Sequence, residues 1–520
     1  MQPILSIAFF TRSDQLADIY GFMLRNWVLI LFVINAILIL GFSYTASLDG
    51  PLHMARAHLL LQYWNDSIAG TQGFIYDIGR LGHVRPLDLV AVGLLKVASP
   101  EVAHQLIIAL LVLMLGLACV SLARSFGGQT SPALLLCLPL TFNVLILFGF
   151  FNFTLVIALS FIAIAWWNKQ KSLSIRSWLS LLLWIVALWW VHRGGPFLFI
   201  ALLAGHELAS WKSSNRKNRE RIILICGVVL ATLAAILFLF QTRTEATSER
   251  NALLDLLTLR PLLMVDQNAE MWFLLVWGAL FLAAIVFSIR VRVRSKVLIP
   301  SDGLWITAGA LILASLVFRT HGAFLVYFVE RAQFVALLLL AIWISVTVRN
   351  RIIMISIAFI SLGIHISRQV FLEEKMAAMG VEHAEVMEAA AHLTPGSIVL
   401  TIPANGNWLF QHEAVWLMID HDGAVLSEKN QYWFAHNNDG PSHLRRTMGG
   451  RFYDLRWMQE YLASDTSSLN LEVFLIGPGN TFPNVDPGLL QEILSLNFKE
   501  EYTNANASVY RLKESKGRAN

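Results

Sequence analysis

A short polar stretch after the first long apolar segment contains the residues best suited to chemistry. It reads Ser-Leu-Asp-Gly-Pro-Leu-His-Met-Ala-Arg and ends at Arg56. Gly50-Pro51 predicts the start of a new helix, because proline fits the first helical turn. On that helix His53 and Arg56 share one face, and Asp49 directly precedes the first turn. A carboxylate, an imidazole and a guanidinium at a membrane surface could accept a proton and bind a phosphate.

Similar side chains recur in turns that lie far apart in the sequence. Together with Asp49 as the catalytic candidate, the predicted substrate-binding residues are His53, Arg56, Arg85, His192, Arg193, His321, Glu330 and Arg331. Ionisable groups at membrane depth are costly and usually face a cavity or a partner. Several arginines at one membrane face suit an anionic ligand, most simply a lipid phosphate or diphosphate.

Each of these residues also has a simpler interpretation. A single arginine or histidine at the end of a membrane helix, such as Arg80, Arg319 or His321, often only anchors that helix at the lipid headgroups. Asp49 gains nothing from headgroup phosphates, but it could be a plain helix N-cap. From the residues alone, both readings of Asp49 stay open.

The composition indicates a polytopic membrane protein with one soluble portion. The chain has 520 residues, of which 56% are hydrophobic and 14% charged, against roughly 25% charged in ordinary soluble domains. Mean hydropathy is +0.60. The basic clusters are short and flank apolar segments, so they indicate membrane orientation. Binding to nucleic acid is therefore not expected.

Eleven apolar segments are candidate membrane crossings. They are 26–44, 103–123, 132–150, 152–168, 178–192, 195–211, 222–240, 271–289, 303–319, 332–348 and 352–368. A cytoplasmic start, with residues 1–25 as an interfacial helix, leaves the basic connections 169–177, 212–221, 290–297 and 349–351 inside, as the positive-inside rule requires. The loops 45–102, 241–270 and 320–331 are then outside, as is the chain after 369.

The first outer loop and the C-terminal region have structure of their own. Within loop 45–102, Pro51–Asn65 and Arg85–Val97 are predicted as interfacial helices that roof a cavity at the outer leaflet. Residues 369–520 are predicted to form a small extracytoplasmic α/β domain. It would contain helices at 373–392 and 489–496 and strands at 395–402, 471–476 and 508–512.

Several other kinds of site are not indicated. The six histidines of the C-terminal region lack metal-ligand spacing, so they are predicted to lie on the surface: His383, His392, His412, His421, His436 and His443. The three cysteines fall within apolar segments and predict no disulfide framework. The sequence has no phosphate-binding glycine loop, dinucleotide fingerprint or serine nucleophile elbow.

The residues Asp49, Pro51, His53 and Arg56 form the pattern Asp-x-Pro-x-His-x-x-Arg after the first apolar segment. With the long first outer loop, the many crossings and the outer soluble tail, this resembles the integral-membrane glycosyltransferases of the GT-C superfamily, especially bacterial members with the same pattern. Arg85-Pro86, the run Gly-Phe-Phe-Asn-Phe from Gly149 and the turn histidine His192 add to the likeness. The resemblance covers residues 26–368.

The resemblance implies a reaction. Such enzymes transfer a sugar from a polyprenyl-phosphate donor to a lipid, glycan or protein acceptor, here at the outer face of a bacterial inner membrane. It implies that Asp49 is the general base of an inverting transfer. Arg56, Arg193 and Arg331 would stabilise the leaving phosphate, and His53 would orient Asp49 or contact that phosphate.

Two points stay open. Many relatives have a second acid beside the first, where this chain has Gly50, so a divalent metal is possible and no other cofactor is expected. The alternative function is a transporter or flippase of an anionic lipid-linked substrate, and a third, weaker one is a polymerase or ligase of lipid-linked glycans. Transporters place ionisable groups near the bilayer midplane and often have two related halves. The polar groups here gather at one leaflet and no internal repeat is present, which favours the enzyme.

Overall fold

The computed structural model describes most of the chain from Asn26 onward. The described residues are 26–65, 74–76, 83–127, 130–170, 174–210, 252–259, 262, 265–295, 297–317, 327–403, 408–410, 412–421, 424–426, 434–436, 470–477 and 487–513. The predicted interfacial helix 1–25 and the predicted crossing 222–240 lie outside them. The chain divides into two compact units. We call Met1–Gly41, Ile108–Leu145 and Phe151–Leu372 the helical unit, and Phe42–Ile107, Ile146–Phe150 and Glu373–Asn520 the mixed unit.

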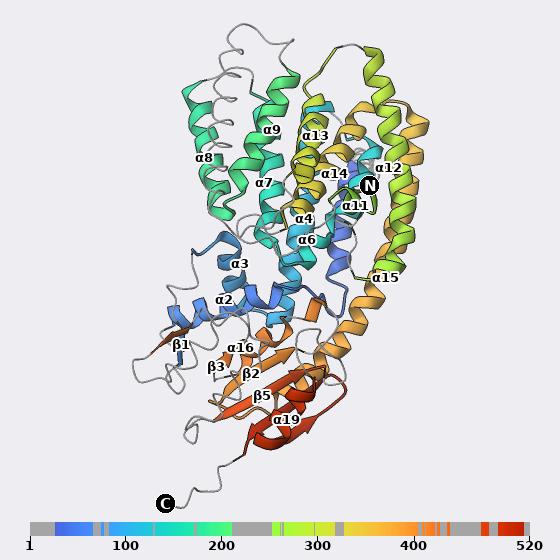
Figure 1. Ribbon diagram of the computed structural model, residues 1–520. Helices are drawn as coiled ribbons and strands as arrows, with labels where there is room; N and C mark the ends of the chain where they lie inside the picture. Colours follow the sequence, from blue (N-terminus) through green and yellow to red (C-terminus); the bar gives the residue numbers. More distant parts are fainter. Residues whose placement is uncertain are drawn as a thin grey trace, which may run out of the picture. The chain divides into compact units, whose positions relative to one another are not determined.

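Long apolar helices make up the helical unit (Figure 1). It contains a helix at Asn26–Ile39, most of α4 (Pro100–Gly127), η2 (Pro132–Cys137), α5 (Leu138–Thr141), the start of α6 (Val144–Leu147), α7 (Phe151–Asn168), α8 (Ile175–Val191), α9 (Gly195–Ala209), α11 (Ala252–Leu257), α12 (Gln267–Ser295), α13 (Asp302–Val317), α14 (Phe328–Thr347) and the first half of α15 (Arg351–Ala390). Five of the described helices are long and apolar enough to cross a membrane: α4, α7, α12, α14 and α15. The chain is thus a helical protein with membrane-length helices, and eleven crossings stay a prediction.

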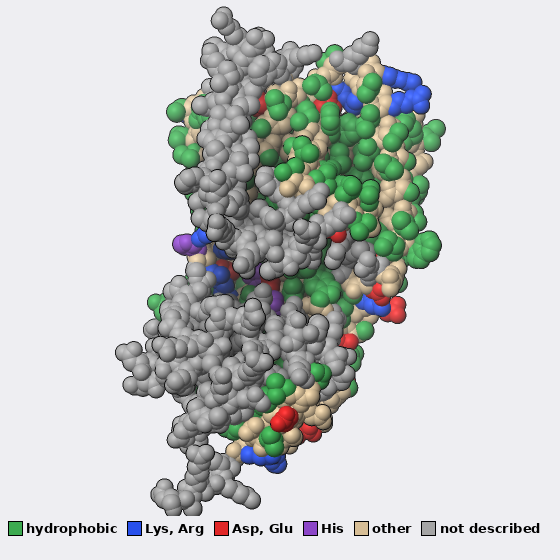
Figure 2. Space-filling view, in the orientation of Figure 1, with side chains coloured by type: hydrophobic (Ala, Val, Ile, Leu, Met, Phe, Trp, Pro, Cys, Tyr) green, Lys and Arg blue, Asp and Glu red, His purple; other side chains and the backbone are tan. Residues whose placement is uncertain are grey.

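Outer helices of this unit present apolar side chains on their surface. On α8, Leu182, Leu183 and Val186 are each more than half exposed, and on α12 so is Trp272. Figure 2 shows hydrophobic side chains over much of the visible surface of the helical unit. An apolar outer surface over long helices is the arrangement that a lipid environment stabilises.

One helix, α14, forms the core of the helical unit. It packs against α13, α12 and η2. Nearly all of its residues are buried, among them Phe334, Leu338 and Trp343. A helix that is apolar all round is stable only when other protein or lipid covers every face.

The mixed unit is built around a five-stranded sheet (Figure 1). The strand order is β3-β2-β5-β7-β6, with β2 (Ile398–Pro403), β3 (Ala424–Leu426), β5 (Leu471–Ile476), β6 (Phe498–Thr503) and β7 (Ala507–Leu512). β2 pairs in parallel with β3 and β5, whereas β7 pairs antiparallel with β5 and β6. α19 (Pro487–Asn497) connects β5 to the β6–β7 hairpin. The strands predicted at 471–476 and 508–512 and the helix predicted at 489–496 are confirmed, and the strand predicted at 395–402 begins at Ile398.

The first loop belongs to this same unit. Its helices are α2 (Gly50–Trp64) and α3 (Pro86–Leu95), which pack against each other. Both begin with a proline in the first turn, as the sequence predicts. Strand β1 (Phe74–Tyr76) of the loop pairs antiparallel with β4 (Phe434–His436) of the C-terminal region. Segments hundreds of residues apart therefore share backbone hydrogen bonds.

Two predicted segments differ from the structure. The crossing predicted at 132–150 is divided into η2, α5 and α6, with Phe142 in an extended conformation after α5. The crossing predicted at 352–368 and the helix predicted at 373–392 are one continuous helix, α15, of 40 residues. The connecting residues contain no glycine or proline, so nothing in the backbone breaks the helix. At 1.5 Å per residue it is about 60 Å long, roughly twice the hydrocarbon thickness of a bilayer.

Candidate functional site

Asp49 stands at the N-cap position of α2, but its carboxylate does not cap the helix. Its side chain makes no cap hydrogen bond to the first turn. Instead, its Oδ1 lies 2.8 Å from Nδ1 of His412. The Asp49 side chain is 27% exposed, whereas that of His412 is 4% exposed. The carboxylate thus makes no hydrogen bond to the N–H groups of the first turn and is partly exposed to solvent.

The backbone of Gly149 packs directly against Asp49. Gly149 has a φ of +77°, a conformation that favours glycine, and a Cβ added there would lie 2.6 Å from the Cβ of Asp49. Its carbonyl accepts a hydrogen bond of 2.9 Å from Nε2 of His53. Because a carbonyl only accepts, this bond places the proton of a neutral His53 on Nε2. The hydrogen bond between His53 and Gly149 therefore fixes the position of the His53 ring and of the Gly149 backbone beside Asp49.

His53 is held in its neutral form. Burial lowers the pKa of His53 from its ordinary 6.5, and the carboxylates of Asp88 and Asp49 oppose that shift without overcoming it. The imidazole therefore adds no full positive charge beside Asp49 at neutral pH.

Arg56 has partners within the first loop. Its Nη2 lies 3.3 Å from Oδ2 of the buried Asp88 and donates a 2.6 Å hydrogen bond to the carbonyl of His83. Asp88 also accepts a 2.8 Å bond from the backbone N–H of Arg85, at the start of α3. Asp88 thus compensates much of the charge of Arg56 and fixes the entry into α3.

A buried polar network lies next to this group, and the sequence did not reveal it. Ser47 Oγ is 2.8 Å from Nε2 of His104 on α4. The Tyr44 ring stacks on that of His383, with centroids 4.5 Å apart. Tyr44 and His383 both hydrogen-bond to the carboxylate of Glu413.

The prediction that the C-terminal histidines lie on the surface is wrong for two of them. His383 and His412 are buried, whereas His392 is exposed, as predicted. His412 lies between two short apolar stretches, Trp408–Phe410 and Ala414–Ile419, and these are the signal that could have indicated its burial.

Aromatic residues stand on both sides of Gly149 in the chain. The rings of Phe148 and Phe150 have centroids 5.4 Å apart, and Trp408 contacts Phe148 at 5.0 Å. All three side chains are partly exposed. Partly exposed aromatic side chains therefore lie next to Gly149, the residue that packs against Asp49.

The other predicted site residues lie in the helical unit. The guanidinium carbon of Arg331 lies 5.0 Å from the ring centroid of Phe153, and His192 meets the same ring edge-on at 5.4 Å. Nδ1 of His192 accepts a 3.0 Å bond from the N–H of Gly194. The structure thus brings His192 and Arg331 together around one aromatic ring.

The remaining predicted residues differ in exposure. Arg193 is exposed in the turn after α8, whereas Glu330 is buried in the first turn of α14. His321 lies outside the described residues, as do Arg80 and Arg319. Each of these contacts is internal to one unit, so the approach of Arg193 and Arg331 to Asp49 stays a prediction.

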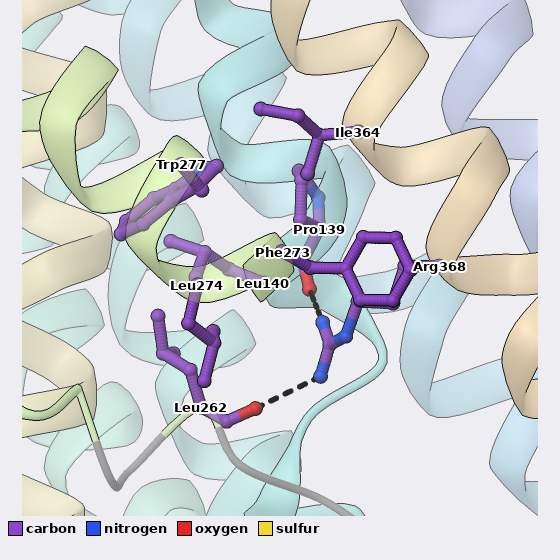
Figure 3. Close-up of a pocket in the computed structure, with 8 residues that line it drawn as sticks. All are labelled: Pro139, Leu140, Leu262, Phe273, Leu274, Trp277, Ile364 and Arg368. Carbon is purple, nitrogen blue, oxygen red and sulfur yellow. Dashed lines mark hydrogen bonds between the residues drawn. The ribbon is translucent and has the colours of Figure 1, made fainter. Parts of the chain in front are cut away.

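A small cavity lies among the helices of the helical unit. Pro139, Leu140, Leu262, Phe273, Leu274, Trp277, Ile364 and Arg368 line it (Figure 3). Its volume is about 10 Å³, enough for about one water molecule. Arg368 donates bonds of 2.8 and 2.9 Å to the carbonyls of Pro139 and Leu262 and pairs with Glu270 at 3.4 Å. Arg368 on α15 therefore connects this helix to the Pro139 and Leu262 backbone and to Glu270 on α12.

Within the described residues, no group of three or more histidine, cysteine, aspartate or glutamate side chains could hold a metal ion.

No protein-family model matches the chain, and no curated protein matches it. A functional conclusion therefore depends on the arrangement around Asp49.

Proposed function

We propose that this chain is a membrane glycosyltransferase. It transfers a sugar from a polyprenyl-phosphate donor to a lipid, glycan or protein acceptor at the outer face of a bacterial inner membrane. The mixed unit then faces the cell envelope. The observation that supports this most is the carboxylate of Asp49, which is partly exposed, does not cap its helix and lies 2.8 Å from His412, while Gly149 packs against the same residue.

In this proposal Asp49 is the general base. Its carboxylate, which lies against His412, takes the proton of an acceptor hydroxyl. The hydroxyl oxygen attacks the anomeric carbon of the donor sugar from the face opposite the lipid phosphate. The bond from that carbon to the phosphate oxygen breaks, the phosphate leaves with the electron pair, and the configuration inverts.

The surroundings of Asp49 favour this role. The N-terminus of α2 stabilises negative charge at this position. The neutral His53 anchors the Gly149 backbone without adding a positive charge that would weaken the base. A polar group aimed at a reacting atom is most effective when its neighbours hold it in place before substrate binds.

The donor phosphate needs positive charge from elsewhere. Asp88 already compensates much of the charge of Arg56, and Arg193 and Arg331 are further candidates for binding the lipid phosphate. Arg193 is exposed, and Arg331 lies over the Phe153 ring. The planar guanidinium of an arginine can bind a phosphate through two parallel N–H bonds.

The test is sugar transfer in membranes supplied with a labelled polyprenyl-phosphate sugar. Asp49→Asn preserves shape and removes the base, so transfer falls at least about 100-fold, the lower end of what a positioned base contributes. The control is Glu492→Gln, an exposed acid on α19, which leaves transfer unchanged. Full turnover by Asp49→Asn would reject the assignment.

A transporter or flippase is the second candidate, and one observation favours it. Within the helical unit, His365 on α15 lies 2.9 Å from Asn35, next to the buried pair of Arg368 and Glu270. Ionisable groups inside apolar helices often mark a transport path. Vesicle uptake of a lipid-linked substrate without a covalent product would favour this candidate over the enzyme.

A further inference from the structure

One short segment of the C-terminal region supplies several contacts to the first loop and its neighbours. It comprises η5 (Trp408–Phe410), His412, η6 (Glu413–Trp416) and α16 (Leu417–Asp420). Both η6 and α16 pack against α2. Trp408 contacts Phe148, and Trp416 meets the His104 ring edge-on at 5.7 Å. Most contacts of this segment are apolar or buried, and the ring of His412 lies against a partly exposed carboxylate.

The geometry assigns different roles to His412 and Asp49. Asp49 is the more exposed of the two and can reach a substrate, whereas His412 is almost completely buried behind it. Within the described part of the chain, Nε2 of His412 has no hydrogen-bond partner. Burying a polar atom without a partner is unfavourable, and a leucine or phenylalanine would fill this space without that cost. Packing alone therefore does not account for a histidine here.

The other ring nitrogen of His412 is the one that faces Asp49. Its Nδ1 is 2.8 Å from Oδ1 of Asp49, a distance typical of a charge-assisted hydrogen bond. The two groups are close but not yet aligned as a full hydrogen bond among the described residues. Contacts of this kind in catalytic sites often tighten when substrate binds.

We propose that His412 is a positioning residue for the Asp49 carboxylate, an inference that rests on the proposed function. With its proton on Nδ1, the ring donates to Oδ1 of Asp49, selects one side-chain rotamer and turns the second oxygen toward the acceptor hydroxyl. His412 contacts no reacting atom. The C-terminal region is then a part of the catalytic unit, because it holds the base supplied by the first loop.

Two amide substitutions test this role, because they place a donor at different ring positions. The amide nitrogen of His412→Asn overlies Nδ1 and keeps a donor to Asp49, whereas that of His412→Gln overlies Nε2 and does not. We expect His412→Gln to lower kcat about 100-fold, the lower end of the contribution of a positioned base. We expect KM for the lipid-linked donor to stay unchanged, and His412→Asn to retain kcat within about tenfold of the wild type. A loss in kcat at constant KM indicates that the substitution removed an interaction made only in the transition state.

The control is His392→Asn, at an exposed histidine of the same region that stacks on Tyr502, which leaves kcat unchanged. Thermal unfolding in detergent shows whether each variant is folded. Equal losses in His412→Asn and His412→Gln, or wild-type kcat in His412→Gln, would overturn the inference while the transferase function stands. A wild-type chain that transfers no sugar from any lipid-linked donor would instead remove the proposed function, and this inference with it.

Discussion

Replacing Gly149 with alanine is expected to displace Asp49. The added methyl carbon would lie 2.6 Å from Cβ, 2.8 Å from Cα and 2.9 Å from the carbonyl carbon of Asp49. Two of these are backbone atoms at the start of α2, so no flexible side-chain end can move away. Either the turn around Gly149 or the first turn of α2 has to shift.

The cost follows from two separate effects. A non-glycine residue in the left-handed conformation costs about 1–2 kcal/mol, and a methyl group forced into a packed site costs about 1–3 kcal/mol. Together they lower the free energy of unfolding by about 2–5 kcal/mol. The catalytic effect is separate from this stability loss, since a misplacement of about 1 Å can cost about 100-fold in rate.

The assay compares Gly149→Ala with Gly93→Ala in the same unit. Nothing lies within 4 Å of a Cβ added at Gly93, which stands inside α3. There alanine stabilises the helix by about 0.5–1 kcal/mol. We therefore expect thermal unfolding in detergent to move in opposite directions for the two variants, and sugar transfer to fall only in Gly149→Ala.

The result that would refute this reasoning is a Gly149→Ala variant with the unfolding temperature and transfer rate of the wild type. Such a variant would mean that the Gly149 backbone does not pack against Asp49 in the working protein. Lost stability with unchanged turnover would keep the packing and remove Asp49 from the chemistry.

Two further predictions concern residues next to this carboxylate. The pKa of His53 is lowered in the folded protein and is about 6.5 in the unfolded chain. At a pH between these two values the unfolded chain binds more protons than the folded one, so the free energy of unfolding decreases as pH falls through this range. His53→Gln keeps a donor for Gly149 but does not titrate, and unfolding from pH 5 to 7.5 should show a shallower pH dependence; an unchanged slope would contradict the assignment. Asp88→Asn leaves the Arg56 guanidinium without its carboxylate and should destabilise by about 1–3 kcal/mol. Denaturant unfolding measures this loss, and a variant as stable as the wild type would show that the pair contributes nothing.

Local patterns predicted the elements that begin with clear signals. Pro51 and Pro86 each stand in the first turn of a helix, and both helices are where the sequence put them. The break expected before residue 373 is absent, because a change from apolar to polar composition ends a membrane segment without ending a helix. Composition reports the environment of a helix, and its end is set by residues such as glycine and proline.

The candidate site was predictable only in its local part. Asp49, His53 and Arg56 lie on or beside one helix, so their spacing alone indicates that they are neighbours. The contact between Asp49 and His412 joins segments from opposite ends of the chain, and no periodicity connects them. The pairing of Arg56 with Asp88 likewise depends on how α2 packs against α3.

An aspartate directly before a proline-initiated helix would ordinarily bind the N–H groups of the first turn. That interaction would direct the carboxylate inward and weaken it as a base. At Asp49 the cap is absent, and a histidine from the far end of the chain contacts the carboxylate instead. The helix end still stabilises its negative charge, while the carboxylate stays partly exposed. In the proposed transferase the N-terminus of α2 therefore supports the base, and this use depends on Gly149 and His412, which both contact Asp49.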